Sequence, residues 1–277
     1  MWDPSQGLEY DETVQTGLSP DLEQVVHASF EPVAHAVLHD LPVYIYGPAG
    51  SGKNVLVEQV ALALDLDFHF MGCVTDEFKL SGFVDARGVY HETEFYRAFK
   101  DGGIFFLDEF DASDPAVAIA LNGAIANRYF SFPTETLRAH PDFRVVAAGN
   151  TLGTGRDDVY TGRMQLDAAS LNRFVTIPVD YDPMIDSFCA KGDGDLLAFI
   201  HAYRSACSQM GIPSVASYRN IKMIKAFEDV MIREQVLELA LVKDLGPDDV
   251  NALLGTGLFD MDNHWSRALR DLAGAEG

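Results

Sequence analysis

The sequence predicts an α/β fold, in which a P-loop-type parallel sheet flanked by helices is followed by a small all-α region. Three observations predict it. An apolar run at residues 43–46 leads into a glycine-rich segment and then into a helical pattern. Two further apolar runs, residues 104–107 and 143–149, end in polar residues, as buried parallel strands do. After Asp182 the pattern is helical throughout, and Gly211 is placed to end one of these helices.

The glycine-rich segment has the composition of a phosphate-binding loop. It consists of Gly47, Pro48, Ala49, Gly50, Ser51, Gly52, Lys53 and Asn54. Glycines let consecutive N–H groups point at phosphate oxygens, and the helix that follows adds its positive N-terminal end. Lys53 supplies a mobile positive charge for the outer phosphates. The spacing matches G-x-x-x-x-G-K-[ST] except at Asn54, which replaces the usual hydroxyl ligand of Mg²⁺.

A second motif distinguishes this interpretation from an ordinary glycine-rich turn. Four apolar residues, 104–107, are followed directly by Asp108 and Glu109. Ligands of parallel α/β sheets bind at the carboxyl ends of the strands. In a nucleotide site the first carboxylate holds Mg²⁺, and the second orients or deprotonates the attacking water. The two motifs predict an ATPase that uses ATP and Mg²⁺, with the amide oxygen of Asn54 as a neutral second ligand of the metal.

The paired motifs resemble those of the AAA+ ATPases, in the branch that contains MoxR-type, cobalt-chelatase-type, McrB-type and midasin or dynein-related modules. The resemblance runs from about Leu41 to Asp182, extends more weakly through the C-terminal helices, and is close to uncharacterised phage-type ATPases. It implies that Asn150, at the tip of the strand 143–149, is a first sensor that orients the water.

The resemblance also implies roles for two arginines, and each has an ordinary alternative. Arg173 resembles an arginine finger that reaches the neighbouring subunit, but it could instead cap the preceding helix. Arg219, which opens a later helix, resembles a second sensor that reaches the phosphates, although an arginine at a helix start is otherwise unremarkable and is mildly disfavoured by the helix dipole. Arg156 and Arg163 fit either a second contact in trans or a surface charge.

Two segments resemble further parts of this branch. Residues 126–142 resemble the hairpin that precedes the sensor strand. Residues 76–100 resemble an insert that faces the ring pore or a partner, and a surface hairpin explains them equally well.

Ser113, Asp114 and Pro115 predict the start of an alanine-rich helix that ends near Asn127.

Length and composition agree with one large core and a smaller second one, because 48% of the 277 residues are apolar. We expect an N-terminal arm and helix over residues 1–40, a large α/β ATPase subdomain over 41–182, and a helical lid over 183–277. The first helix is expected to begin at residues 19–21 and to end near Leu38.

Other residue patterns argue against membranes, disulfides and a separate metal site. No run of 18 apolar residues and no signal-peptide pattern occurs, so a cytoplasmic location is expected. Cys73, Cys189 and Cys207 are scattered and suggest reduced thiols. His35 and His39 are spaced for a shared ligand, but without a third donor they are expected to be surface residues.

The charge bears on the partner. With 42 acidic residues against 20 Lys and Arg, the net charge of −22 opposes binding to nucleic acid, although a locally basic ring pore would escape this argument. We therefore expect a homo-oligomeric ring, most simply a hexamer, that remodels a protein partner. A DNA-directed phage or defence motor and a slow ATP-binding switch or scaffold are the alternatives.

Overall fold

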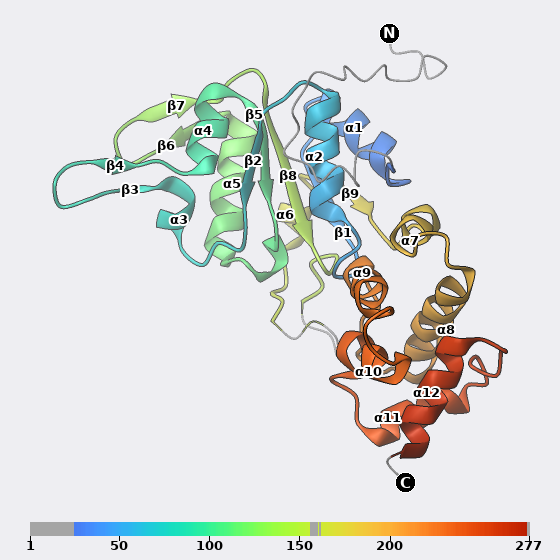
Figure 1. Ribbon diagram of the computed structural model, residues 1–277. Helices are drawn as coiled ribbons and strands as arrows, with labels where there is room; N and C mark the ends of the chain where they lie inside the picture. The colour runs from blue at the N-terminus through green and yellow to red at the C-terminus, as the bar shows by residue number, and fades with distance from the viewer. Residues whose placement is uncertain (1–24, 156–159, 161, 276–277) are drawn as a thin grey trace. The chain divides into compact units, whose positions relative to one another are not determined.

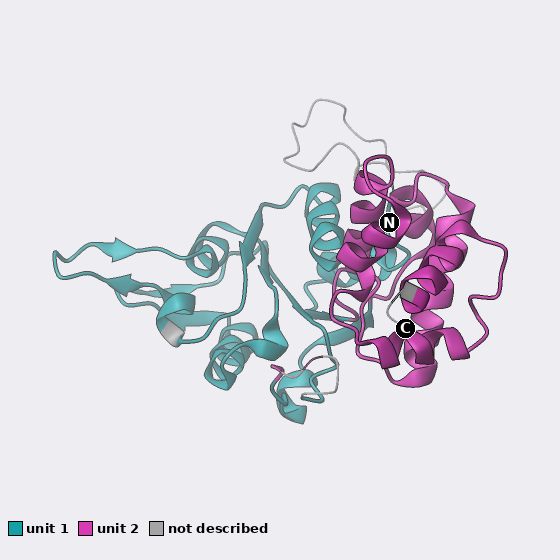
Figure 2. Ribbon diagram, turned by 60° about the horizontal axis from the view of Figure 1, so that its bottom comes forward, with its two compact units in different colours: residues 1–46, 53–155, 164–178 teal, residues 47–52, 156–163, 179–277 magenta. Residues whose placement is uncertain are grey.

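The computed structural model describes residues 25–155, 160 and 162–275 (Figure 1). The predicted N-terminal arm, the expected helix start at residues 19–21, and Arg156 lie outside the described residues. By internal contacts the chain divides into two compact units (Figure 2). The first comprises the described residues up to 46, 53–155 and 164–178, and the second comprises 47–52, the described part of 156–163, and residues from 179 onward.

The first unit is built on a five-stranded parallel sheet, which confirms the predicted fold class. Its strands follow the order β2-β5-β8-β1-β9. Their bounds are β1 (Val43–Tyr46), β2 (Phe68–Met71), β5 (Gly103–Leu107), β8 (Phe143–Gly149) and β9 (Val175–Pro178). The central strand β8 pairs with β5 on one side and β1 on the other, so the ends of these three strands lie next to one another.

Helices cover both faces of this sheet. Figure 1 shows α4 and α5 on one side and α1 and α2 on the other. The helices of this unit are α1 (Phe30–Leu38), α2 (Lys53–Ala63), α3 (Glu77–Ser81), α4 (Glu94–Asp101), the 3-10 turn η1 (Phe110–Ala112), α5 (Pro115–Asn127) and α6 (Ala168–Leu171). On the α4 side the core is rich in aromatic rings, because Phe95 packs against Phe105 of β5 and Phe143 of β8.

Local signals account for several helix ends, but not for the start of the first helix. Asp114 accepts a hydrogen bond from the N–H of Ala116 and caps α5, as expected from its sequence. The first helix ends at Leu38 as predicted but begins only at Phe30, so its expected extent over residues 25–29 is wrong. There the N–H of Ser29 donates to Nδ1 of His27, a local bond that competes with helix formation.

Two short antiparallel hairpins complete the first unit. One, at the segment predicted to form a hairpin before the sensor strand, pairs β6 (Tyr129–Ser131) with β7 (Thr136–Arg138). The other pairs β3 (Phe83–Val84) with β4 (Tyr90–His91) inside the predicted insert, and Phe83 and Val84 are exposed there.

The second unit is helical from residue 183 onward. It contains α7 (Pro183–Cys189), α8 (Gly194–Met210), α9 (Tyr218–Phe227), α10 (Arg233–Leu237), a π-helical turn η2 (Glu238–Val242), α11 (Pro247–Gly255) and α12 (His264–Ala275). Gly211 ends α8 in the left-handed conformation with φ 65°, as predicted. The core of this unit is formed around Phe199, Tyr203 and Trp265.

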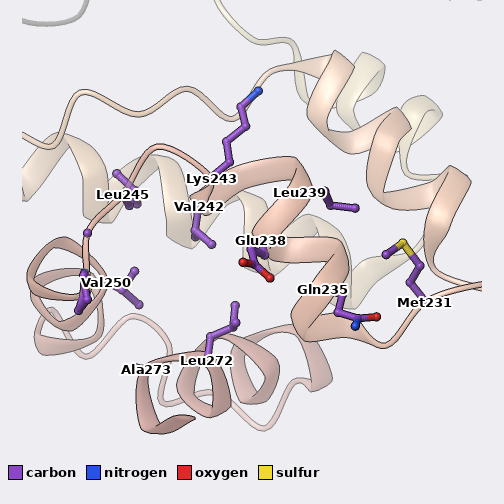
Figure 3. Close-up of a pocket in the computed structure, with 12 residues that line it drawn as sticks. Met231, Gln235, Glu238, Leu239, Val242, Lys243, Leu245, Val250, Leu272 and Ala273 are labelled. Carbon is purple, nitrogen blue, oxygen red and sulfur yellow. The ribbon is translucent and has the colours of Figure 1, made fainter. Parts of the chain in front are cut away.

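A hollow of about 530 Å³ lies in the helical unit among α10, η2, α11 and α12 (Figure 3). Apolar side chains, including Val242 and Leu272, form much of its wall, and none of the predicted site residues lines it. Among the described residues, no helix is both long and apolar enough to cross a membrane.

Candidate active site

The carboxyl ends of neighbouring strands bring several predicted site residues to one edge of the sheet. Asp108 and Glu109 follow β5, and Asn150 follows β8, which pairs with β5. Lys53 is the first residue of α2, the helix that follows β1 and the glycine-rich loop. The sequence folds this way because each strand is an apolar run that ends abruptly in polar residues.

Lys53 and Asn150 are in direct contact. The Lys53 Nζ donates to the Asn150 Oδ1 over 3.0 Å, although the two residues are 97 positions apart. Only 6% of Lys53 is exposed, which is rare for a lysine. The fold therefore brings two residues that are distant in the sequence into contact, and the buried Lys53 ammonium donates to a neutral amide.

The turn after β5 holds Glu109 in an uncommon backbone conformation. Glu109 is left-handed, with φ 54° and ψ 39°. Its N–H donates to Oδ1 of Asp108 over 2.8 Å, and its carbonyl accepts the N–H of Ala112 over 2.9 Å. Left-handed residues other than glycine are strained and cluster at functional sites. The residue is exposed, so a carboxylate at this position can reach a reacting molecule.

The donor set at this edge suits magnesium more than a softer metal. Asp108 offers a half-buried carboxylate and Asn54 an exposed amide on α2. Mg²⁺ prefers such oxygen ligands and is commonly held by one or two protein groups together with substrate phosphates. In the part of the chain that the structure describes, no group of three or more His, Cys, Asp or Glu side chains is arranged around a metal site. Asp108 and Asn54 thus fit Mg²⁺ that is shared with a phosphate ligand.

The glycine-rich loop packs within the second unit, where glycine is required. A Cβ atom at Gly47 would lie 2.1 Å from the carbonyl oxygen of Val179, and one at Gly50 would lie 2.6 Å from Cβ of Ser217. Gly50 also has a φ of +71°. Ser51 is fully buried, and its Oγ has no hydrogen-bond partner among the described residues. A buried hydroxyl of this kind in a glycine loop fits a polar ligand such as phosphate.

Two tyrosines hold the peptide groups of Ala49 in this loop. The hydroxyl of Tyr181 donates to the Ala49 carbonyl over 2.9 Å, and the Ala49 N–H donates to the hydroxyl oxygen of Tyr160 over 2.8 Å. Burial raises the pKa of Tyr181 above its usual value, which keeps its hydroxyl protonated as a donor.

The Tyr181 ring is itself fixed from the helical side. The Arg204 guanidinium lies 3.8 Å from its centroid. Arg204 forms a two-point ion pair with the buried Asp186, with N–O distances of 2.5 and 2.8 Å, and also donates to the Ala216 carbonyl. This ion pair therefore holds the ring that contacts the loop.

Two of the predicted arginines, Arg173 and Arg219, occupy exposed positions. The Arg173 Nη1 donates to the Ala169 carbonyl over 2.5 Å, which is the helix-capping geometry that the sequence left as an alternative. Asp167 is the N-cap of this helix, α6, and the hydrogen bond from the Ser170 hydroxyl lowers the pKa of the Asp167 carboxyl. Arg219 is the exposed second residue of α9, and Arg163 is half-buried.

Sequence reasoning missed three residues that support the site: Tyr44, Asp111 and Tyr181. Each makes its contact with a residue more than 35 positions away, such as Asp111 with Thr151. An acid that follows a strand looks like a solvated turn residue, whereas Asp111 is fully buried. No local signal in the chain distinguishes the two cases.

Comparison with known proteins bears directly on this arrangement. Residues 42–174 match the model of the AAA domain, dynein-related subfamily. The match covers the glycine-rich loop, the strand ends that carry Asp108, Glu109 and Asn150, and Arg173. Over these residues the chain is therefore similar to the AAA domain of that subfamily.

The chain is also similar in sequence to uncharacterised proteins and in fold to solved structures. Uncharacterised proteins of Staphylococcus aureus, from strains USA300 and NCTC 8325, are each 32% identical over 152 residues, covering 50% of this chain and 55% of theirs. The chain thus spans about half the length of these curated relatives. Among solved structures, NtrX from Brucella abortus has a TM-score of 0.51 at 16% identity over 78% of this chain and 53% of its own. Its complex with ATP has a TM-score of 0.50 at 15% identity, over 77% and 50%. At such identities the likeness concerns the fold alone.

Proposed function

We propose that this protein is a Mg²⁺-dependent ATPase whose reaction takes place at the carboxyl edge of the sheet. The observation that carries the proposal is the contact of Lys53 with Asn150, beside the strand end that bears Asp108 and Glu109. A lysine, an amide and two carboxylates at adjacent strand ends provide charge neutralisation, water orientation and proton removal in one place.

Each residue has a role in this scheme. Lys53 and the N–H groups of the loop 47–52 bind the phosphates of ATP. Glu109 accepts a proton from the attacking water, and Asn150 orients that water. Asp108 and Asn54 would hold Mg²⁺, which supplies positive charge to the phosphate oxygens when it is bound.

Two arginines complete the proposed reaction. Arg173 reaches the active site of a neighbouring subunit and stabilises charge in the transition state, a contribution of about a thousandfold or more in comparable systems. Arg219, at the start of α9, contacts the phosphates from the helical lid, residues 183–277. For Arg173 this requires that the side chain leave the Ala169 carbonyl when a neighbour docks.

At the level of assembly, we propose a ring, most simply a hexamer of the MoxR-like branch, that remodels a protein partner. The net charge of −22 favours a protein over a nucleic acid as the partner. A slow ATP-binding switch is the second candidate, because Asn54 puts a neutral amide on a longer side chain in place of the usual hydroxyl ligand of Mg²⁺.

The test separates binding from chemistry. Lys53→Ala is expected to abolish ATP binding, since it removes the buried cation. Glu109→Gln is expected to keep binding and to lose turnover. Nucleotide binding is measured by calorimetry and phosphate release by a continuous assay. Glu31→Gln, an exposed change of the same kind in the first turn of α1, is the matched control. Normal hydrolysis by Glu109→Gln would show that another group activates the water, and tight binding without turnover in the native protein would favour the switch.

A further inference from the structure

Asp111 is a buried carboxylate that the proposed reaction does not use. It lies in η1, two residues after Glu109, and its exposed fraction is 0%. A single oxygen, Oδ2, accepts three hydrogen bonds, from the N–H of Asn150, the N–H of Thr151 and the hydroxyl of Thr151, each 3.0 Å long. A buried carboxylate is costly to maintain unless its hydrogen bonds are satisfied, so these contacts strongly favour one arrangement of the two loops.

The loop that carries Asn150 is held from a second side as well. The hydroxyl of Tyr44 donates to the Thr151 carbonyl over 2.6 Å. At Gly149 a Cβ atom would lie 2.1 Å from the Tyr44 hydroxyl and 2.9 Å from Cγ of Asp111. The chain can therefore pass between these two side chains only as glycine, which leaves the peptide groups before and after Asn150 little room to shift.

The turn that carries Glu109 is equally fixed to Asp111. Phe110, between them, is buried and packs against the rings of Tyr44 and Phe174. The Ser113 hydroxyl and the Ala112 N–H both donate to the Glu109 carbonyl. A shift of Asp111 would thus move the backbone from which Glu109 extends.

We propose that Asp111 is a positioning residue that sets the separation between Glu109 and Asn150. It links the group that accepts the proton to the group that orients the water, through backbone contacts that a substrate does not touch. The inference rests on the proposed ATPase function. Its physical basis is that a displacement of about 1 Å in a catalytic group costs on the order of 100-fold in rate.

The test compares Asp111→Ala with Asp111→Asn. An asparagine oxygen can accept the same three bonds, whereas alanine accepts none. Asp111→Ala is expected to lower kcat by about 10-fold to 100-fold, with the Kd for ATP changed less than about threefold. Asp111→Asn is expected to restore most of the rate. The amide protons of Asn150 and Thr151 should exchange faster in the alanine variant and stay protected in the asparagine variant.

A matched control distinguishes positioning from lost stability. Asp114→Ala removes the half-buried cap of α5, three residues further on, and destabilises the same region without touching the Asn150 loop. It should lower the melting temperature yet keep kcat per folded molecule. A native kcat in Asp111→Ala would overturn this inference but not the proposed function. The same would follow if kcat and the fraction of protein that binds ATP fell by equal factors, because lost folding would then explain the result. Absence of turnover in the native protein would overturn the proposed function and this inference with it.

Discussion

Asn54 is the residue whose chemistry departs most from that of a phosphate-binding loop. It is exposed at the start of α2, next to the buried Lys53. An amide oxygen is a neutral ligand on a longer arm than a hydroxyl, so it binds Mg²⁺ with different geometry. Metal affinity is therefore the property in which this site should differ.

Asn54→Thr is expected to lower the Mg²⁺ concentration at half-maximal turnover. A gain of about 1 kcal/mol in metal binding would correspond to roughly a fivefold shift. The measurement is the rate of phosphate release as a function of Mg²⁺ at saturating ATP. An unchanged midpoint would mean that Asn54 does not ligate the metal.

At Gly47, a close contact with the protein's own backbone, and not with a ligand, requires glycine. Gly47→Ala would place a Cβ atom 2.1 Å from the Val179 carbonyl oxygen, an atom that cannot turn aside. The free energy of unfolding should fall by about 2–3 kcal/mol in denaturant titrations. Gly123→Ala is the control, because nothing lies within 4 Å of its Cβ position inside α5. It should stabilise the protein by about 0.5–1 kcal/mol. A native stability for Gly47→Ala would show that the loop can move away from Val179.

Elements differ in how far the sequence determines them. The strand β5 and the helix α5 could be predicted because their signals are local: a run of four apolar residues, and a Pro at the first turn after an Asp cap. The turn η1 between them could not, since its conformation depends on where Asp111 finds its partners. The same holds for Tyr181 and Ala49, which are 132 positions apart.

The candidate site follows the same division. Four site residues could be proposed from the sequence because each comes after an apolar run, directly or through the glycine-rich loop. The sheet order brings these residues to one edge: Lys53, Asp108, Glu109 and Asn150. Their roles remain predictions. Whether Arg173 points to a neighbour or to its own helix cannot be read from the sequence, because both uses need the same residue at the same place. In the structure its side chain contacts Ala169.

Tyr181→Phe tests the connection between the helical unit and the phosphate loop. Loss of the bond to the Ala49 carbonyl removes about 0.5–1.5 kcal/mol, so the Kd for ATP should rise about 2-fold to 13-fold. Calorimetric titration measures the change. Tyr203→Phe is a matched control, since Tyr203 is a buried tyrosine of the same unit whose hydroxyl contacts Ser214 and the Leu241 carbonyl instead. Equal loss of affinity in both variants would mean that general destabilisation is the cause.

At the scale of the whole molecule, the decisive property is whether active sites are completed by neighbours. Arg173→Ala and Glu109→Gln should each abolish turnover when assayed separately. Mixed together, they should regain part of it, because a Glu109→Gln subunit can offer its intact Arg173 to a site that still has Glu109. The measurement is turnover per subunit across mixing ratios, after controlled subunit exchange. No recovery at any ratio would place the arginine in its own subunit or outside the reaction.

The overall charge gives a prediction about the partner. With a net charge of −22, capture experiments at physiological salt should retain protein and not DNA, and ATP should change the amount retained. The protein is immobilised and exposed to purified DNA and to cell extract, with and without ATP. Specific retention of DNA that falls with rising salt would instead favour the DNA-directed motor.

The division into two units has a consequence for the fragments into which the chain can be cut. The chain passes from one unit to the other five times, after residues 46, 52, 155, 163 and 178. A cut at any one of these points yields two fragments, at least one of which carries segments of both units. Residues 47–52 of the glycine-rich loop belong by contacts to the second unit, most of which lies after residue 178. A fragment that begins at 179 would thus lack the partners of Val179 and Ser217, and one that ends at 178 would keep the loop but lose the surface on which Gly47 and Gly50 are packed. Neither unit is one continuous segment of the chain, so we expect the folding of both units to be observed as one event.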